Sequence, residues 1–136
     1  MIAVDTNVLV HAVDSGEPGK SARAWALLER LQREPTVLLW RVVCEFGAVI
    51  RRKQRTSHIR MDVPSLVSAW MEVYRLALPT RGVLRRGWGL IESHQPSYWD
   101  AMLIAACEEV GVDTLHSEDL QSSPVVGNVR LISPFA

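Results

Sequence analysis

The chain has 136 residues with 15 basic and 15 acidic side chains, so its formal net charge is zero. This length fits one compact domain over 1–136, and a hydrophobic content of 48% supplies its core. No stretch reaches the ~18 apolar residues of a membrane span, and the start lacks the features of a secretion signal, so we expect a cytoplasmic protein without membrane contact.

Short apolar runs alternate with amphipathic stretches along the whole chain. Strands are predicted at 1–4, 36–39, 113–116 and 129–132, with a weaker one at 76–78. Helices are predicted at 20–33, 40–53, 62–76, 81–94 and 97–110. Residues 8–10 are expected to continue into a short helical turn before the first of these helices. The helix at 81–94 is the weakest prediction because glycines interrupt it. Strands that alternate with helices pair in parallel, so the chain is predicted to be an α/β protein with a mainly parallel sheet.

Several aromatic and sulfur-containing side chains fall on the apolar stripes of these helices. We expect the stripe of 20–33 to include Ala22 and Trp25, and both cysteines, Cys44 and Cys107, to be buried free thiols. Three tryptophans could stack on nucleic-acid bases, but their stripe positions favour packing in the core: Trp40, Trp88 and Trp99.

Four acidic residues are candidates for a shared site. Asp5 and Asp119 each follow a predicted strand, at the sheet edge where α/β proteins bind ligands. Glu45 lies within an apolar helix stripe and is expected to point inward, and Asp100 lies in the first turn of another helix. Carboxylates held close together repel, so a proton or a cation must compensate. Oxygen ligands alone favour Mg²⁺ or Mn²⁺, and such a site can hydrolyse a phosphodiester.

Each of these acids also has a structural interpretation. Asp5 and Asp119 could cap helices or turns, and Glu45 could belong to a buried ion pair. Asp100 stands three residues after Ser97, which is the spacing of a capping box. The argument for a site therefore depends on all four acids meeting at one place.

Five segments together resemble the PIN domains, and most of all the VapC toxins of bacterial toxin–antitoxin pairs. They are 4–10 (VDTNVLV), 45–46 (EF), 97–107 (SYWDAMLIAAC), 116–121 (HSEDLQ) and 132–135 (ISPF). The resemblance implies a three-layer α/β/α fold and a Mg²⁺- or Mn²⁺-dependent endoribonuclease acting on RNA such as tRNA or rRNA. It also implies a homodimer that a cognate VapB-type antitoxin holds inactive.

The same resemblance assigns roles to particular residues. The metal-binding and catalytic acids would be Asp5, Glu45, Asp100 and Asp119, and the neighbours that support them or contact the substrate would be Thr6, Asn7 and Ser117.

Other functions remain possible at this stage. A PIN-like module that binds RNA or a partner without cutting it is the main alternative. A phosphohydrolase with Asp5 as nucleophile is disfavoured, because the second acid expected two residues later is replaced by Asn7. The basic stretch 51–55, with His58 and Arg60 beyond it, could follow an RNA backbone, although a solvated helix end explains it more simply.

Overall fold

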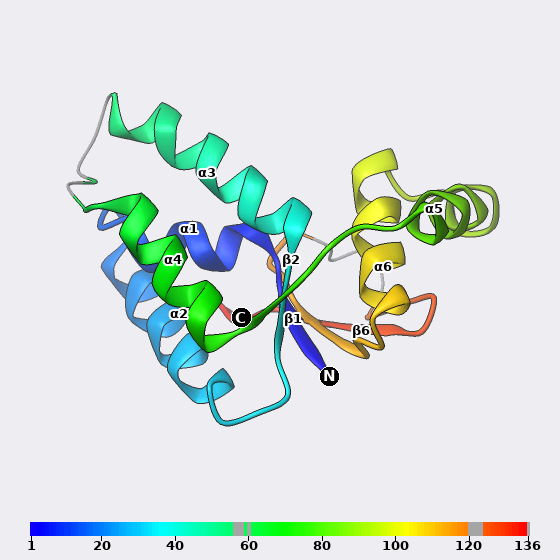
Figure 1. The fold of residues 1–136 in the computed structure, drawn as a ribbon, viewed down its shortest axis with the longest axis horizontal. Coiled ribbons are helices and arrows are strands. Elements are labelled where there is room, and N and C mark those ends of the chain that lie inside the picture. The colour runs from blue at the N-terminus through cyan, green and yellow to red at the C-terminus, as the bar shows by residue number, and fades with distance from the viewer. Residues whose placement is uncertain (56–58, 60, 120–123, 136) are drawn as a thin grey trace.

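The computed structural model describes residues 1–55, 59, 61–119 and 124–135 (Figure 1). The strands are β1 (Ile2–Val4), β2 (Val37–Leu39), β3 (Arg75–Ala77), β4 (Thr114–His116), β5 (Val125–Val126) and β6 (Val129–Ile132). The helices are α1 (Thr6–Val13), α2 (Pro18–Leu31), α3 (Trp40–Gln54), α4 (Val63–Val73), α5 (Arg81–His94) and α6 (Tyr98–Glu109). None of the described helices is long and apolar enough to cross a membrane.

The strands form a mainly parallel sheet, as predicted. One group has the order β1-β4-β6-β5, in which only the β5–β6 pair is antiparallel, and β2 pairs in parallel with β3. A parallel bridge between Ile2 and Thr36 joins the two groups. The carboxyl ends of β1, β2 and β4 therefore point to the same edge of the sheet.

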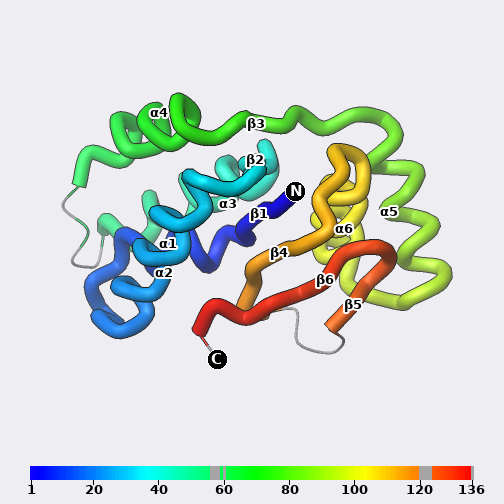
Figure 2. The backbone as a smooth tube through the Cα atoms, turned by 90° about the horizontal axis from the view of Figure 1, so that it is seen from below, coloured from blue at the N-terminus to red at the C-terminus, as the bar shows by residue number. Residues whose placement is uncertain are grey.

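Helices cover the sheet on both sides, which confirms the three-layer α/β/α fold. Figures 1 and 2 show α1, α2 and α4 on one side of the strands and α5 and α6 on the other. Apolar residues of both helical layers and of the sheet belong to one continuous buried cluster. The site described below lies where this packing ends, at the carboxyl edge of the strands.

Two local elements differ from the sequence prediction. The short turn expected after 8–10 is a complete helix, α1, which Asp5 caps. The strand β5 was not predicted, because two residues are too few for a periodic pattern. Gly127, with φ +57°, makes the turn that folds β5 back onto β6.

The prediction that the tryptophans pack in the core was wrong. Trp40, Trp88 and Trp99 are 47%, 55% and 61% exposed, and Trp25 is also exposed. Helix α2 buries Ala24, Leu27, Leu28 and Leu31, so Ala24 and Leu27 take the places expected of Ala22 and Trp25. An indole is apolar enough to match a buried helix stripe in the sequence, but other apolar side chains already occupy the buried stripes of these helices.

The cysteines are both free, but only one is buried. Cys107 lies in the core, where burial raises the pKa of its thiol, whereas Cys44 is exposed on α3. The expectation that Cys44 is buried was therefore wrong. Cys44 lies on the outer face of α3 because the buried stripe of this helix runs through Val42, Phe46 and Ile50.

The basic end of α3 is divided between solvent and an ion pair. Arg51, Arg52 and Arg55 are exposed. The Lys53 ammonium donates to a carboxylate oxygen of Asp14 at 2.7 Å, which ties α3 to the end of α1. His58 and Arg60, the remainder of this basic stretch, lie outside the described residues.

Helix α5 forms despite its glycines, and one of them is needed for packing. Gly87 is buried against α6, and a Cβ atom placed there would lie 2.5 Å from the Met102 sulfur. The glycine therefore allows α5 to approach α6 closely. Gly89, two residues further on, has no atom within 4 Å of the same position.

We expect Gly87→Val to destabilise the protein by about 1–3 kcal/mol, because the added side chain overpacks the contact with Met102. Gly89→Ala is the matched control, and it should stabilise the helix by up to about 1 kcal/mol because open space surrounds that position. Urea denaturation of both variants measures the two changes. Equal effects at the two positions would contradict the role given to Gly87.

Candidate active site

The buried carboxylate of Asp5 is the centre of the site. Asp5 directly follows β1, and its backbone N–H donates to the His116 carbonyl at the end of β4, at 2.9 Å. Its carboxylate accepts from the Thr6 backbone N–H and from the Ser117 hydroxyl, each at 2.7 Å. Burial raises the pKa of Asp5, and the nearby Glu45 charge adds to this effect, while those hydrogen bonds and Arg41 oppose it. The Asp5 carboxylate is thus both the N-cap of α1 and the buried acid of the site.

Asn7 and Ser117 connect Asp5 to Asp119. The Asn7 side-chain amide donates to Asp119 at 3.1 Å and reaches Ser117 Oγ at 3.4 Å and the Asp5 carboxylate at 3.5 Å. Ser117 Oγ also accepts from the Asp119 backbone N–H at 3.3 Å. These bonds hold the Asp5 and Asp119 carboxylates on either side of one amide group. Residues 120–123, which follow Asp119, are not among the described residues.

Glu45 lies at the edge of the buried stripe and not within it, so the expectation of an inward side chain was wrong. Its side chain is 46% exposed. It precedes buried Phe46 by one residue, which places it about 100° around the helix from that residue. The Glu45 carboxylate accepts from the Thr6 hydroxyl at 3.1 Å and lies 3.5 Å from Arg41 Nη2. Thr6 thus places Glu45 beside Asp5.

Asp100 lies in a cavity that it shares with Glu45. The Ser97 hydroxyl accepts from the Asp100 backbone N–H at 3.2 Å, so Ser97 caps α6. Among the described residues the second bond of a capping box, from the Ser97 backbone N–H to the Asp100 carboxylate, is absent. Within the described part of the chain, no hydrogen bond occupies the Asp100 carboxylate. Asp100 and Glu45 line one open cavity of about 590 Å³ together with Trp40, Arg41, Cys44 and Trp99. The structure therefore connects Asp100 to Glu45 by this cavity, and not by direct bonding.

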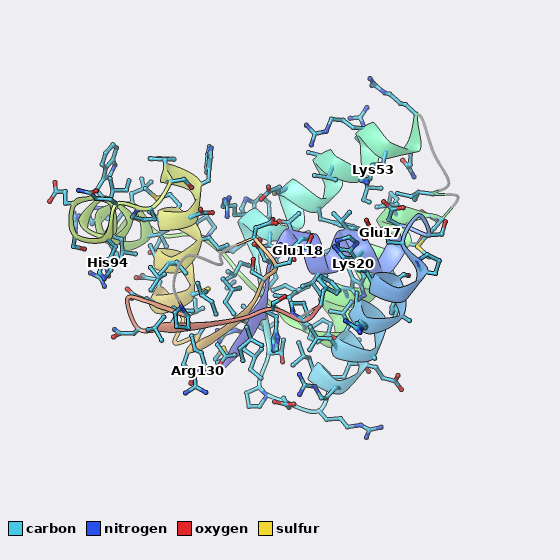
Figure 3. The ribbon with its side chains drawn as sticks, turned by 180° about the vertical axis from the view of Figure 1, so that it is seen from behind. Glu17, Lys20, Lys53, His94, Glu118 and Arg130 are labelled. Carbon is cyan, nitrogen blue, oxygen red and sulfur yellow. The ribbon has the colours of Figure 1, made fainter. Side chains whose placement is uncertain are left out.

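A second group of charges fixes the loop that carries Asp119. The neighbouring Glu118 carboxylate accepts from Lys20 Nζ at 3.1 Å and lies 3.2 Å from His11 Nε2. Figure 3 shows Glu118 and Lys20 together near the start of α2. The pKa of Glu118 is lowered because these two partners outweigh the effect of its burial. Glu118 N–H also donates to Asn7 Oδ1 at 3.4 Å, which joins this group to the acid site.

Neither the His94 nor the His116 side chain takes part in the site. His94 is exposed at the end of α5, away from Glu118 and Lys20 (Figure 3). His116 is buried at the end of β4, where burial lowers its pKa and its Nδ1 atom has no partner among the described residues.

The donor set fits a hard divalent cation. The acids offer carboxylate oxygens only, which suit Mg²⁺ or Mn²⁺ better than Zn²⁺. Among the described residues, no three His, Cys, Asp or Glu side chains stand close enough to hold one ion by themselves. Mg²⁺ is commonly held by one or two carboxylates and keeps several waters, so such a set is not required. Asp5, whose pKa is raised by burial, is the group that a nearby cation would stabilise most.

Sequence reasoning missed Arg41, and it favoured core packing for Trp40 and Trp99, which line the cavity. Arg41 precedes Glu45 by four residues, so the two share a helix face, and this spacing was the available signal. The Arg41 guanidinium lies 5.4 Å from the centre of the Trp99 ring. Trp99 immediately precedes Asp100, which could have suggested a position beside the acids.

The fold and site together define an α/β protein with an acidic site at the carboxyl edge of a parallel sheet. A sequence profile of the PIN domain matches residues 2–123, and the chain belongs to this family. No curated protein matches the chain.

Solved structures share this fold over nearly the whole chain. The Mycobacterium tuberculosis toxin VapC20, described as cleaving the sarcin–ricin loop, is 22% identical with a TM-score of 0.68, covering 96% of this chain and 99% of its own. A chain from the structure of FitAB bound to an IR36 DNA fragment is 18% identical with a TM-score of 0.69, covering 100% of this chain and 96% of its own. At these identities the similarity confirms the PIN-like fold.

Replacing Asp5 with Asn tests the cost of the buried charge. In EDTA near neutral pH, Asp5→Asn should stabilise the fold by on the order of 1 kcal/mol, because the amide still caps α1 without a buried charge. Millimolar Mn²⁺ should raise the melting temperature of the wild type and leave that of the variant nearly unchanged. Asp113→Asn, which removes an exposed acid at the opposite end of β4, should keep the Mn²⁺ response. Identical Mn²⁺ responses in wild type and Asp5→Asn would argue against a cation at Asp5.

Removing the cation that holds Glu118 should loosen the Asp119 loop. We expect Lys20→Met to increase hydrogen exchange at the Glu118 and Asp119 amides several-fold, because Glu118 loses its ammonium partner. Glu17→Gln is the control, since it removes the other carboxylate partner of Lys20 and leaves the bond to Glu118 in place. Unchanged exchange in Lys20→Met, measured by mass spectrometry, would mean that the ion pair between Lys20 and Glu118 does not hold the loop.

Proposed function

We propose that this protein is a divalent-metal-dependent endoribonuclease, with Mg²⁺ or Mn²⁺ as its cofactor and RNA as its substrate. The observation that carries the proposal is the chain of hydrogen bonds that links Asp119 through Asn7 to Asp5, and Asp5 through Thr6 to Glu45. Asp100 lines the same cavity as Glu45. We assign Asp5, Glu45, Asp100 and Asp119 as the acids around the cation, of which one or two would bind it directly while water completes its shell. Thr6, Asn7 and Ser117 are the groups that orient these acids.

The bound cation would polarise the scissile phosphate and make an attacking water more acidic. The side chains around the acids would orient the carboxylates and contact the RNA backbone. Asn7 and Ser117 fix the carboxylate orientations by donating to them, so less reorganisation is needed when the substrate arrives. Arg41, beside Glu45, offers a fixed positive charge to the RNA backbone.

We further propose that the protein is the toxin of a VapBC-type pair that acts in the cytoplasm. The similarity of the fold to the VapC20 toxin and to a chain of FitAB supports this role. On this proposal a cognate VapB-type antitoxin covers the acidic site, and the toxin itself is a homodimer. Copurification with the product of a neighbouring small gene, and light scattering of the purified toxin, test these two parts.

The direct test is cleavage of total cellular RNA by the purified protein freed of any copurified partner. We expect discrete fragments with Mn²⁺, none with EDTA, and a loss of at least 100-fold in rate for Asp5→Asn, since a preorganised charged group of this kind contributes on that order. Asp113→Asn should cleave like the wild type. Binding of RNA without cleavage in Mn²⁺ would favour the alternative, a PIN-like module that recognises RNA or a partner without cutting it.

A further inference from the structure

An exposed row of aromatic side chains borders the acidic cavity. Trp88, Tyr98 and Trp99 touch edge to face, with ring centres 5.7 Å apart for Trp88–Tyr98 and 5.1 Å for Tyr98–Trp99. All three are exposed, so the row is not part of the core. A contiguous exposed apolar patch commonly marks a site of contact with another molecule.

Two tryptophans bring this row to the acids. Trp40 begins α3 and Trp99 lies in the first turn of α6, and both line the cavity that contains Glu45 and Asp100. Between them, Arg41 lies over the Trp99 ring at 5.4 Å and beside Glu45 at 3.5 Å. The cavity thus combines aromatic faces, one cation and two carboxylates.

The Arg41 guanidinium is not fully satisfied within the protein. Its Nη1 atom is buried and has no hydrogen-bond partner among the described residues. A buried donor without an acceptor costs stability, and the contacts of Arg41 with Glu45 and Trp99 leave this atom unpaired. A phosphate that enters the cavity would give this guanidinium an anionic acceptor.

We propose that Trp40 and Trp99 form a subsite that stacks one purine base of the substrate, with Arg41 contacting the adjoining phosphate. This inference rests on the proposed ribonuclease function and names the residues that determine specificity beside its acids. Aromatic rings stack on exposed base faces, and a purine offers a larger face than a pyrimidine. A duplex covers the faces of its bases, so the base in the subsite must be unstacked.

The charge of the cavity favours a nucleotide over an apolar segment of another protein. Arg41 supplies one positive charge against the carboxylates of Glu45 and Asp100. A bound divalent cation, as the proposed function requires, would make the charge of the cavity positive. A purely apolar partner would leave these charges buried without compensation. A second copy of the chain remains the rival occupant, and the test below separates it.

The experiment measures binding by fluorescence anisotropy of labelled 2′-O-methyl nine-mers in Mn²⁺, with the integrity of each probe checked on a gel. Oligoadenylate should bind the wild type more tightly than oligouridylate or the duplex of the two. Trp99→Ala and Trp40→Ala should each weaken oligoadenylate binding about tenfold and reduce the preference for adenine. Trp99→Phe should retain most of the affinity. Trp25→Ala, which removes an exposed indole from α2, is the matched control and should bind like the wild type.

Three results would overturn the subsite. The first is wild-type affinity in folded Trp99→Ala and Trp40→Ala proteins, and the second is the absence of a purine preference in the wild type. The third is a lower particle mass of Trp99→Ala than of the wild type in light scattering, with RNA binding intact. The last result would assign the aromatic face to a contact between copies of the chain. Cleavage by the wild type together with unaffected Trp variants would reject the subsite alone, whereas tryptophan-dependent binding without cleavage would reject the nuclease and keep the subsite.

Discussion

The parallel pairing of β1 with β4 is the constraint on which the acidic site depends. Val4 is in register with His116, so the next residue on each strand, Asp5 and Ser117, leaves the sheet at the same place. The bond from Asp5 N–H to the His116 carbonyl extends the pairing by one step into the site. A shift of this register would separate Asp5 from Ser117 and bring a different pair of residues to the edge.

Burial of the Asp5 charge costs stability, while the role proposed for Asp5 requires that charge. The carboxylate is buried, and its raised pKa shows that the surroundings favour the neutral form. Ser117 and Thr6 donate hydrogen bonds that keep the charged form accessible. An acid in this balance responds strongly to any cation brought near it, which is the property that a metal-dependent site requires.

The sequence predicted the order of elements well, because the apolar runs that end at Asp5 and Asp119 are local features. The prediction failed where contacts between different elements decide whether a side chain is buried. Glu45 and Trp99 were both placed inside by helical spacing, yet the stripes were filled by other side chains and both face the cavity. Gly87 was expected to weaken α5, although its missing side chain allows α5 to pack closely against Met102 of α6. A single sequence does not contain information about which helix will approach another.

The zero net charge also limits how this protein could attract RNA. The exposed Arg51 lies ten residues beyond Arg41 on α3, or about 15 Å along the helix at 1.5 Å per residue. This distance exceeds the Debye length of about 8 Å at physiological ionic strength, so the basic end of α3 does little to offset the acids of the site. Lys20 is already paired with Glu118. If the proposed ribonuclease function holds, charge compensation must be local, from Arg41 and the proposed divalent cation, and discrimination between RNAs must come mainly from contacts with the bases.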